Sequence, residues 1–81
     1  MRFPRDVSGR QLVRLLERHG YEVVRQSGSH IRLTHAGNPQ HHLTVPDHDP
    51  VKIATAQGII SDAAKHLGVS RDDLATELLQ L

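Results

Sequence analysis

The sequence predicts an α+β fold in which a helix is followed by three antiparallel strands, a longer helix and a short C-terminal helix. Three observations support this fold. A segment with a helix-start signal precedes Gly20, three short segments alternate apolar and polar residues, and apolar residues then recur at helical spacing up to Gly68. Two amphipathic helices on one face of a three-stranded sheet form the simplest two-layer packing, so we expect the other face to stay open.

The first helix is predicted from Gly9 to His19. Ser8, with Gln11 three residues later, forms a capping box, in which each residue satisfies a backbone N–H of the other. Apolar residues form one stripe along the segment: Leu12, Leu15 and Leu16, with Val13 at its edge. Gly20 then provides the usual C-terminal stop.

Three strands are predicted at 21–25, 30–35 and 42–46, separated by turn-forming residues at 27–29 and 36–40. Successive side chains of a strand point to opposite faces, so apolar and polar residues separate. The residues expected to face the core are Ile31, Leu33, Leu43 and Val45. The residues expected on the open face are His30, Arg32, Thr34, His42 and Thr44. The sheet is therefore predicted to be an antiparallel meander with one buried and one polar face.

Two helices complete the predicted fold. Asp49 is the expected cap of the first, because aspartate accepts from helix N–H groups and Pro50 suits the first helical position. Its apolar stripe consists of Ile53, Ala56, Ile59, Ile60, Ala63, Ala64 and Leu67. Ser70, with Asp73 three residues later, begins the last helix. The apolar residues of that helix are Leu74, Leu78 and Leu79.

Length and composition point to one small domain over residues 1–81. The 81 residues include no cysteine, which excludes disulfides and thiolate metal sites and fits a reducing compartment. No apolar run approaches the roughly 18 residues of a membrane helix, and the N-terminus lacks the apolar segment of a signal peptide. We therefore expect a soluble cytoplasmic protein with no membrane association.

Charge is unevenly distributed although the net charge is only +1. Residues 1–35 carry a net charge of +4, all of its bases being arginine, and residues 36–81 carry −3. A basic half suits an anionic polymer. Arg10, Arg14 and Arg18 are spaced four apart and line one side of the first helix. The alternative is that these arginines only keep the helix solvated.

The segment Gly28-Ser29-His30 is the candidate functional site. Histidine exchanges protons near neutral pH, and arginine binds phosphate with a fork of donors, so His30 and Arg32 could together hold a phosphodiester and move a proton beside it. RNA cleavage of this kind needs a base for the 2′-hydroxyl proton, but no metal. Ser29 adds a hydroxyl, and Gly28 is expected to let another backbone approach closely. The alternative is that His30 is an ordinary exposed strand residue.

Four of the seven histidines lie near the second loop and the third strand: His35, His41, His42 and His48. Because His41 and His42 are adjacent in a strand, their side chains diverge, and without cysteine no zinc-ligand spacing is present. We expect no metal and no cofactor. His19 and His66 lie near helix C-termini, where a cation interacts favourably with the helix dipole, and are interpreted as structural.

Asp47 and Asp49 form a possible carboxylate pair for magnesium. The preferred interpretation is that Asp47 ends the third strand and Asp49 caps the following helix.

The motif Arg25-Gln26-Ser27-Gly28-Ser29-His30 lies between a helix–strand unit and the second strand. Val45-Pro46 closes the third strand, and the next helix ends in Ala64-Lys65-His66-Leu67-Gly68. From about Val7 to Leu79, this arrangement resembles the HicA family of bacterial toxins, small mRNA interferases of toxin–antitoxin pairs. One departure is Ala54-Thr55 at the start of the second helix, where the family often has Gly-Thr.

The resemblance implies a double-stranded-RNA-binding-like fold, an endoribonuclease that cleaves mRNA and inhibits translation, and a HicB-type antitoxin partner. It makes His30 the catalytic histidine, as general base or acid, with Gly28 and Ser29 as its support. The residues expected to contact RNA are Arg25, Arg32, Arg10, Arg14 and Lys52. Two alternatives stay open: a non-catalytic RNA-binding module that uses the same face, and a domain that only docks a protein partner.

Overall fold

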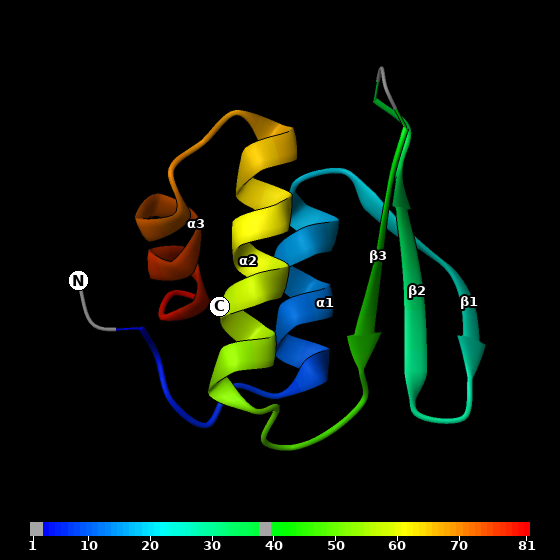
Figure 1. Ribbon diagram of the computed structural model, residues 1–81, viewed down its shortest axis with the longest axis horizontal. Helices are drawn as coiled ribbons and strands as arrows, with labels where there is room; N and C mark the ends of the chain where they lie inside the picture. Colours follow the sequence, from blue (N-terminus) through cyan, green and yellow to red (C-terminus); the bar gives the residue numbers. More distant parts are fainter. Residues whose placement is uncertain (1–2, 38–39) are drawn as a thin grey trace.

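The computed structural model describes residues 3–37 and 40–81, and it confirms the predicted order of elements (Figure 1). The elements are α1 (Gly9–Arg18), β1 (Tyr21–Ser27), β2 (His30–His35), β3 (His41–Pro46), α2 (Ile53–Leu67) and α3 (Arg71–Leu78). Arg2, one of the arginines of the basic first half, and the centre of the loop predicted at 36–40 lie outside the described residues.

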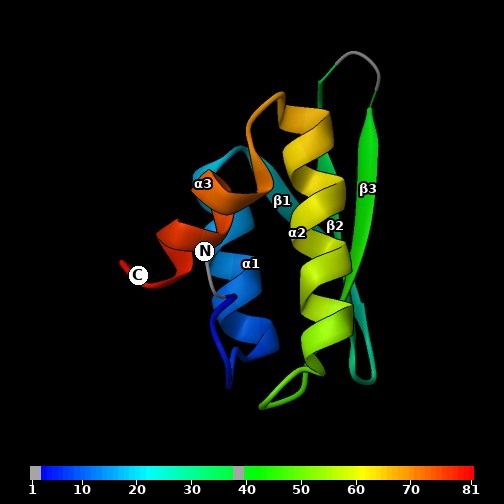
Figure 2. The same cartoon turned by 60° about the vertical axis from the view of Figure 1, so that its left-hand side comes forward.

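The three strands form one antiparallel sheet in the order β1-β2-β3, so β2 is the central strand. Helices α1 and α2 cover one face of this sheet, and α3 packs against them on the side away from the strands (Figures 1 and 2). Among the described residues, no helix covers the opposite face of the sheet, as predicted (Figure 2). None of the helices in the described parts of the chain is both long and apolar enough to cross a bilayer.

The core lies between the inner face of the sheet and the helices. Its largest fully buried side chains are Tyr21, Leu12, Leu15, Leu16, Ile31, Leu33, Ile60, Leu74 and Val45. Burying one such aliphatic side chain stabilises the fold by about 1.5–3 kcal/mol. The predicted inward residues of β2 and β3 are all buried. Ile53 and Leu79 depart from prediction, with 43% and 68% exposure, because they lie at the first position of α2 and just after α3, beyond the packed turns.

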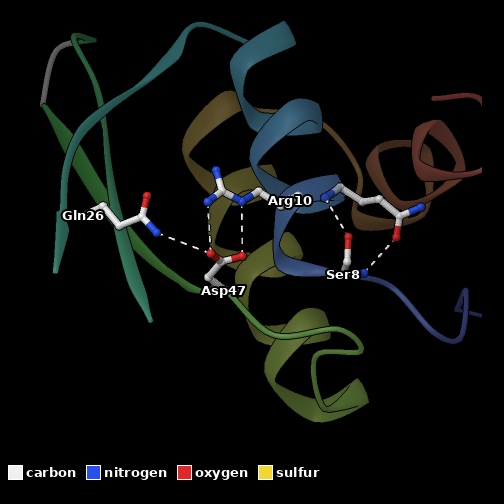
Figure 3. Close-up of polar contacts among 5 residues, drawn as sticks. Ser8, Arg10, Gln26 and Asp47 are labelled. Atoms are coloured by element: carbon white, nitrogen blue, oxygen red, sulfur yellow. Dashed lines mark hydrogen bonds and ion pairs between the residues drawn. The ribbon is translucent and has the colours of Figure 1, made fainter. Parts of the chain in front are cut away.

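Two of the three predicted helix starts are confirmed. Ser8 Oγ accepts from the N–H of Gln11 at 3.1 Å, and Gln11 Oε1 accepts from the N–H of Ser8 at 2.8 Å (Figure 3). At α3, Ser70 Oγ accepts from the N–H of Asp73 at 3.0 Å.

The predicted start of α2 is wrong. Its cap position is Lys52, whose side chain makes no capping bond, and Asp49 lies outside the helix. The reason is that Val51 is buried in the core and its N–H donates to the carbonyl of Val7 at 2.8 Å. Asp49 and Pro50 lie in a bend before α2, and the helix begins only after Val51 and Lys52.

Candidate functional site

The turn between β1 and β2 presents the predicted functional segment. Ser27 pairs with His30 across the hairpin, and Gly28 with Ser29 forms the two-residue turn between them. Gly28 has a φ of +58°, a left-handed conformation that glycine adopts without steric cost. A Cβ at this position would meet nothing within 4 Å, so the predicted close backbone approach is wrong. Gly28 serves the turn by its conformation alone.

His30 begins the central strand on the uncovered face. Its side chain is exposed, and it makes no hydrogen bond with any residue in the described parts of the chain. Arg32 follows on the same face at a separation of about 7 Å along the strand. The alternation predicted from the sequence is therefore confirmed, and the histidine and arginine stand together on an accessible surface.

A register shift in β1 places a second arginine beside Arg32. The pairing moves from Val23↔Leu33 to Arg25↔Arg32, which leaves Val24 as the extra residue of a bulge. Two like charges directly opposite each other across a sheet are destabilising. A bound anion between Arg25 and Arg32 would reverse this repulsion, because it would give both guanidinium groups a partner.

The uncovered surface continues beyond the arginines along β2 and β3. Arg32 pairs with Thr44 and Thr34 pairs with His42, and the Thr34 hydroxyl hydrogen-bonds with His42 Nδ1 at 2.8 Å. We call this surface the open face and define it by Glu22, Arg25, Ser27, His30, Arg32, Thr34, His42 and Thr44. Its side chains are all polar or charged. The acidic Glu22 lies opposite Thr34, away from the hairpin, so it is the end with Arg25, His30 and Arg32 that suits an anionic ligand.

A set of polar contacts fixes the hairpin end of the sheet to α1 (Figure 3). Arg10 donates from Nε and Nη2 to the two carboxylate oxygens of Asp47, at 3.2 and 3.0 Å. Gln26 Nε2 donates to Asp47 Oδ2 at 3.3 Å. We call Arg10, Gln26 and Asp47 the hairpin clamp. Arg10, predicted to contact RNA, is therefore already paired with a carboxylate.

The backbone at the same end is also closely packed. The N–H of Asp47 donates to the carbonyl of Ser29 at 2.7 Å, and the N–H of Gly9 donates to the carbonyl of His48 at 2.8 Å. A Cβ at Gly9 would overlap the carbonyl oxygen of Pro46. Gly9 is thus the position where a close approach between helix and strand requires glycine.

Two other predicted RNA contacts are not on the open face. Arg14 lies on the exposed side of α1, and Lys52 lies at the start of α2, so both belong to the helical layer. The structure therefore brings His30 together with Arg25 and Arg32, places Arg10 in the clamp, and leaves Arg14 and Lys52 apart from this group.

The other end of the sheet holds a cluster that sequence reasoning missed. The histidine–tyrosine cluster consists of Tyr21, His35, His41 and His66, one residue from each strand and one from α2. The Tyr21 hydroxyl hydrogen-bonds with His41 Nδ1 at 2.7 Å, and His66 Nε2 shares a hydrogen bond of 3.0 Å with His35 Nδ1. The rings of His41 and His66 stack with centroids 4.6 Å apart.

Packing changes the acid–base properties of this cluster. Burial, followed by the nearby His41 and His35, lowers the pKa of His66. Burial, with a contribution from the carboxylate of Asp62, raises the pKa of Tyr21 to about 12. Both shifts favour the neutral forms of the side chains.

The predicted grouping of histidines is partly correct. His35 and His41 do meet, but His42 turns to the open face, as expected for neighbours in a strand. The register could have indicated the contact, because His35 pairs with both His41 and Tyr21. The presence of His66 in the cluster could not be predicted in this way, because it depends on how α2 packs on the sheet. Within residues 3–37 and 40–81, no group of three or more histidine or acidic side chains is placed to hold a metal ion.

His19 also has a structural partner, on α3. Its Nε2 lies 2.9 and 3.1 Å from the two carboxylate oxygens of Glu77. The interpretation of His19 as structural therefore agrees with its contacts, although the partner is a carboxylate of another helix.

Comparison with known proteins gives one result. A family model described as the HicA toxin of bacterial toxin–antitoxin systems matches residues 9–69, which is more than half of the chain. The match extends from the first residue of α1 past the end of α2, and α3 lies beyond it. No curated protein and no solved structure gives a significant match.

Proposed function

The chain belongs to the HicA family of bacterial toxins, and from this premise we propose that it is a metal-independent endoribonuclease that cleaves mRNA and so inhibits translation. Membership of a toxin–antitoxin family implies a cognate antitoxin. The order of elements is compatible with the double-stranded-RNA-binding-like fold. The proposal rests mainly on the open face, where exposed His30 lies near Arg25 and Arg32, which pair with each other across β1 and β2.

His30 is proposed to move the proton. Its neutral imidazole accepts the proton of an RNA 2′-hydroxyl, and the freed oxygen attacks the adjacent phosphorus. The bond from phosphorus to the 5′-oxygen of the next nucleotide breaks, and that oxygen receives the proton from His30. The products are a 2′,3′-cyclic phosphate and a 5′-hydroxyl, so atoms and charge balance.

Arg25 and Arg32 are proposed to hold the phosphate that is cut. A negative charge develops on its oxygens during attack, and a guanidinium offers several donors in a fixed fork. A hydrogen bond to a charged group contributes about 1.5–3 kcal/mol. Ser29, next to His30 in the turn, adds a hydroxyl, and Gly28 maintains the turn.

RNA outside the cleaved phosphate is proposed to contact the helical layer. Arg14 and Lys52 are exposed and can reach phosphates of a longer strand. Arg10 contributes to this contact only if it leaves Asp47. We further propose that the antitoxin is of the HicB type and covers the open face, and that the toxin acts in the cytoplasm, where mRNA is translated.

The test is cleavage of a labelled mRNA in excess EDTA, comparing the wild type with His30→Ala. The matched control is His48→Ala, which removes an exposed histidine outside the open face. We expect cleavage by wild type and His48→Ala, no cleavage by His30→Ala, and cyclic phosphate at the new 3′ ends. Equal cleavage by His30→Ala would remove His30 from the mechanism. Salt-dependent RNA binding without cleavage by any variant would identify a non-catalytic RNA-binding module.

The pH dependence provides a second test of the same role. A histidine that accepts a proton must be neutral, and an ordinary histidine becomes neutral through about pH 6–7. The single-turnover cleavage rate should therefore rise over this range. A rate that stays flat from pH 5 to 8 would contradict a histidine base.

A further inference from the structure

The hairpin clamp points to a role for Asp47 in the proposed reaction. We propose that Asp47 is a positioning residue, which holds the His30 hairpin at a fixed place relative to α1. This inference rests on the proposed endoribonuclease function. Asp47 does not contact the His30 side chain, and its negative charge would repel an RNA phosphate, so any role in the reaction is indirect.

The first support is the backbone at the end of β3. Pro46 pairs with His30, and Asp47 follows directly. The N–H of Asp47 donates to the carbonyl of Ser29 at 2.7 Å, and Ser29 is the residue before His30. The main chain of Asp47 is therefore attached to the turn that presents the histidine.

The second support is the side chain. The carboxylate of Asp47 accepts two hydrogen bonds from Arg10 of α1 and one from Gln26 of β1 (Figure 3). One carboxylate thus joins the first turn of α1 to the last residues of β1. Gln26 belongs to the hairpin itself, two residues before Gly28, so this contact holds the hairpin against the helical layer.

The third support is the balance of energies. The side chains of Arg10 and Asp47 are 63% and 28% exposed, and exposed ion pairs usually stabilise a fold by about 0–1 kcal/mol. Loss of the clamp should therefore leave the protein folded. Cleavage is far more sensitive to position, because a displacement of about 1 Å at a reacting group can lower the rate about 100-fold.

Removal of the carboxylate separates positioning from binding. Asp47 carries a negative charge near a basic face, so its loss should leave RNA affinity unchanged or increase it. It also frees Arg10 to contact a phosphate. A positioning role therefore predicts a lower cleavage rate together with equal or tighter RNA binding, a combination that a general loss of structure does not produce.

The experiment measures single-turnover cleavage at saturating protein, RNA affinity and thermal unfolding for Asp47→Ala and Asp47→Asn. We expect Asp47→Ala to cleave at least about tenfold more slowly with RNA affinity no weaker than wild type. Asp47→Asn, which keeps one acceptor oxygen, should recover part of the rate. The matched control is Glu17→Ala, which removes one exposed carboxylate from the other end of α1 and should behave as wild type.

The outcomes are distinguishable from failure of the proposed function. If wild type and Glu17→Ala do not cleave RNA, the endoribonuclease proposal fails. If they cleave and Asp47→Ala cleaves equally fast, Asp47 has no positioning role. Should Asp47→Ala unfold at the assay temperature, Gln26→Ala decides, because it removes one clamp contact and leaves the ion pair. A severalfold slower rate is expected from Gln26→Ala, and a wild-type rate would overturn the inference.

Discussion

The two ends of the sheet use histidine in different ways. At the hairpin end, His30 is exposed, lies near two arginines and belongs to the hairpin that the clamp joins to α1. At the other end, the rings of Tyr21, His35, His41 and His66 pack against one another, and His41 stacks on His66. The face of the strand on which an imidazole lies, together with its neighbours there, therefore decides whether it stays accessible or packs into a cluster.

The contrast is already present within one strand. His30 and His35 begin and end β2, five residues apart, so the alternation of a strand places them on opposite faces. His30 faces the open side, and His35 faces the layer that contains α2. Substitutions at each end should therefore have different consequences for stability and for RNA binding.

The largest effect is expected at the hairpin end from Gly9→Ala. Its Cβ would overlap the carbonyl of Pro46, so α1 and β3 must move apart, and overpacking of this kind costs about 1–3 kcal/mol. Urea unfolding should show that loss. Gly58→Ala is the matched control, because its Cβ would meet nothing within 4 Å and alanine favours a helix by up to about 1 kcal/mol. Equal stability of Gly9→Ala and wild type would contradict the close packing at this end.

The next largest effect is expected at the histidine–tyrosine cluster, as a loss of stability in acid. Because the pKa of His66 is lowered by burial, His41 and His35, the unfolded chain binds more protons than the folded chain below about pH 6.5. This contribution to stability should be constant between about pH 6.5 and 8, and it should fall as pH decreases from about 6.5 towards the lowered pKa of His66. The urea concentration at the midpoint of unfolding, measured at several pH values between 8 and 5, tests this expectation.

Two variants identify the source of the acid loss. His66→Gln should show a shallower decrease than wild type, and His48→Gln, at an exposed histidine outside the cluster, should keep the wild-type slope. Identical slopes for His66→Gln and wild type would show that the cluster does not govern the acid response.

Tyr21→Phe should cost about 1 kcal/mol near neutral pH, because it removes the hydrogen bond to His41 and keeps the buried ring. It should also change the alkaline response. With the pKa of Tyr21 raised to about 12, wild type loses stability as pH rises above about 10, where the unfolded chain ionises first. Tyr21→Phe should lack this loss, and chemical unfolding at pH 8 and 10.5 tests both effects. If Tyr21→Phe lost as much stability at pH 10.5 as wild type does, the alkaline loss would have to come from another group.

The repulsion between Arg25 and Arg32 gives a smaller effect of opposite sign. Arg25→Ala should raise stability by a few tenths of a kcal/mol, within the range of about 0.2–1 kcal/mol for cross-strand pairs. It should also weaken RNA binding and reduce the salt slope of the affinity by about 0.7, the value for one lost phosphate contact on a single strand. Unchanged RNA affinity would remove Arg25 from the proposed interface.

The smallest effect is expected from Arg14→Ala, on the exposed side of α1. Stability should change by less than about 0.5 kcal/mol. RNA affinity should fall less than in Arg25→Ala, because Arg14 lies outside the open face. Filter binding at two salt concentrations compares the two variants, and an equal loss would place the main RNA contact on the helical layer.

Local patterns were sufficient for most of the fold and for the central part of the candidate site. The capping box at Ser8 and the N-cap bond at Ser70 depend on residues three apart, and strand alternation predicted which side of β2 His30 and Arg32 occupy. These features are decided by neighbours in the sequence. The predicted cap at Asp49 failed because a distant contact, Val51 with Val7, competes with the local signal.

Short-range periodicity and motif spacing were enough to predict the order of elements, the face on which His30 lies and the family resemblance. Three features depend on the folded chain: the bulge that brings Arg25 opposite Arg32, the ion pair of Asp47 with Arg10 and the contact of His66 with His35. The last two join residues 37 and 31 positions apart in the chain, and the first depends on a bulge within a hairpin. Their geometry depends on strand register and on how the helices pack, and no local pattern encodes either.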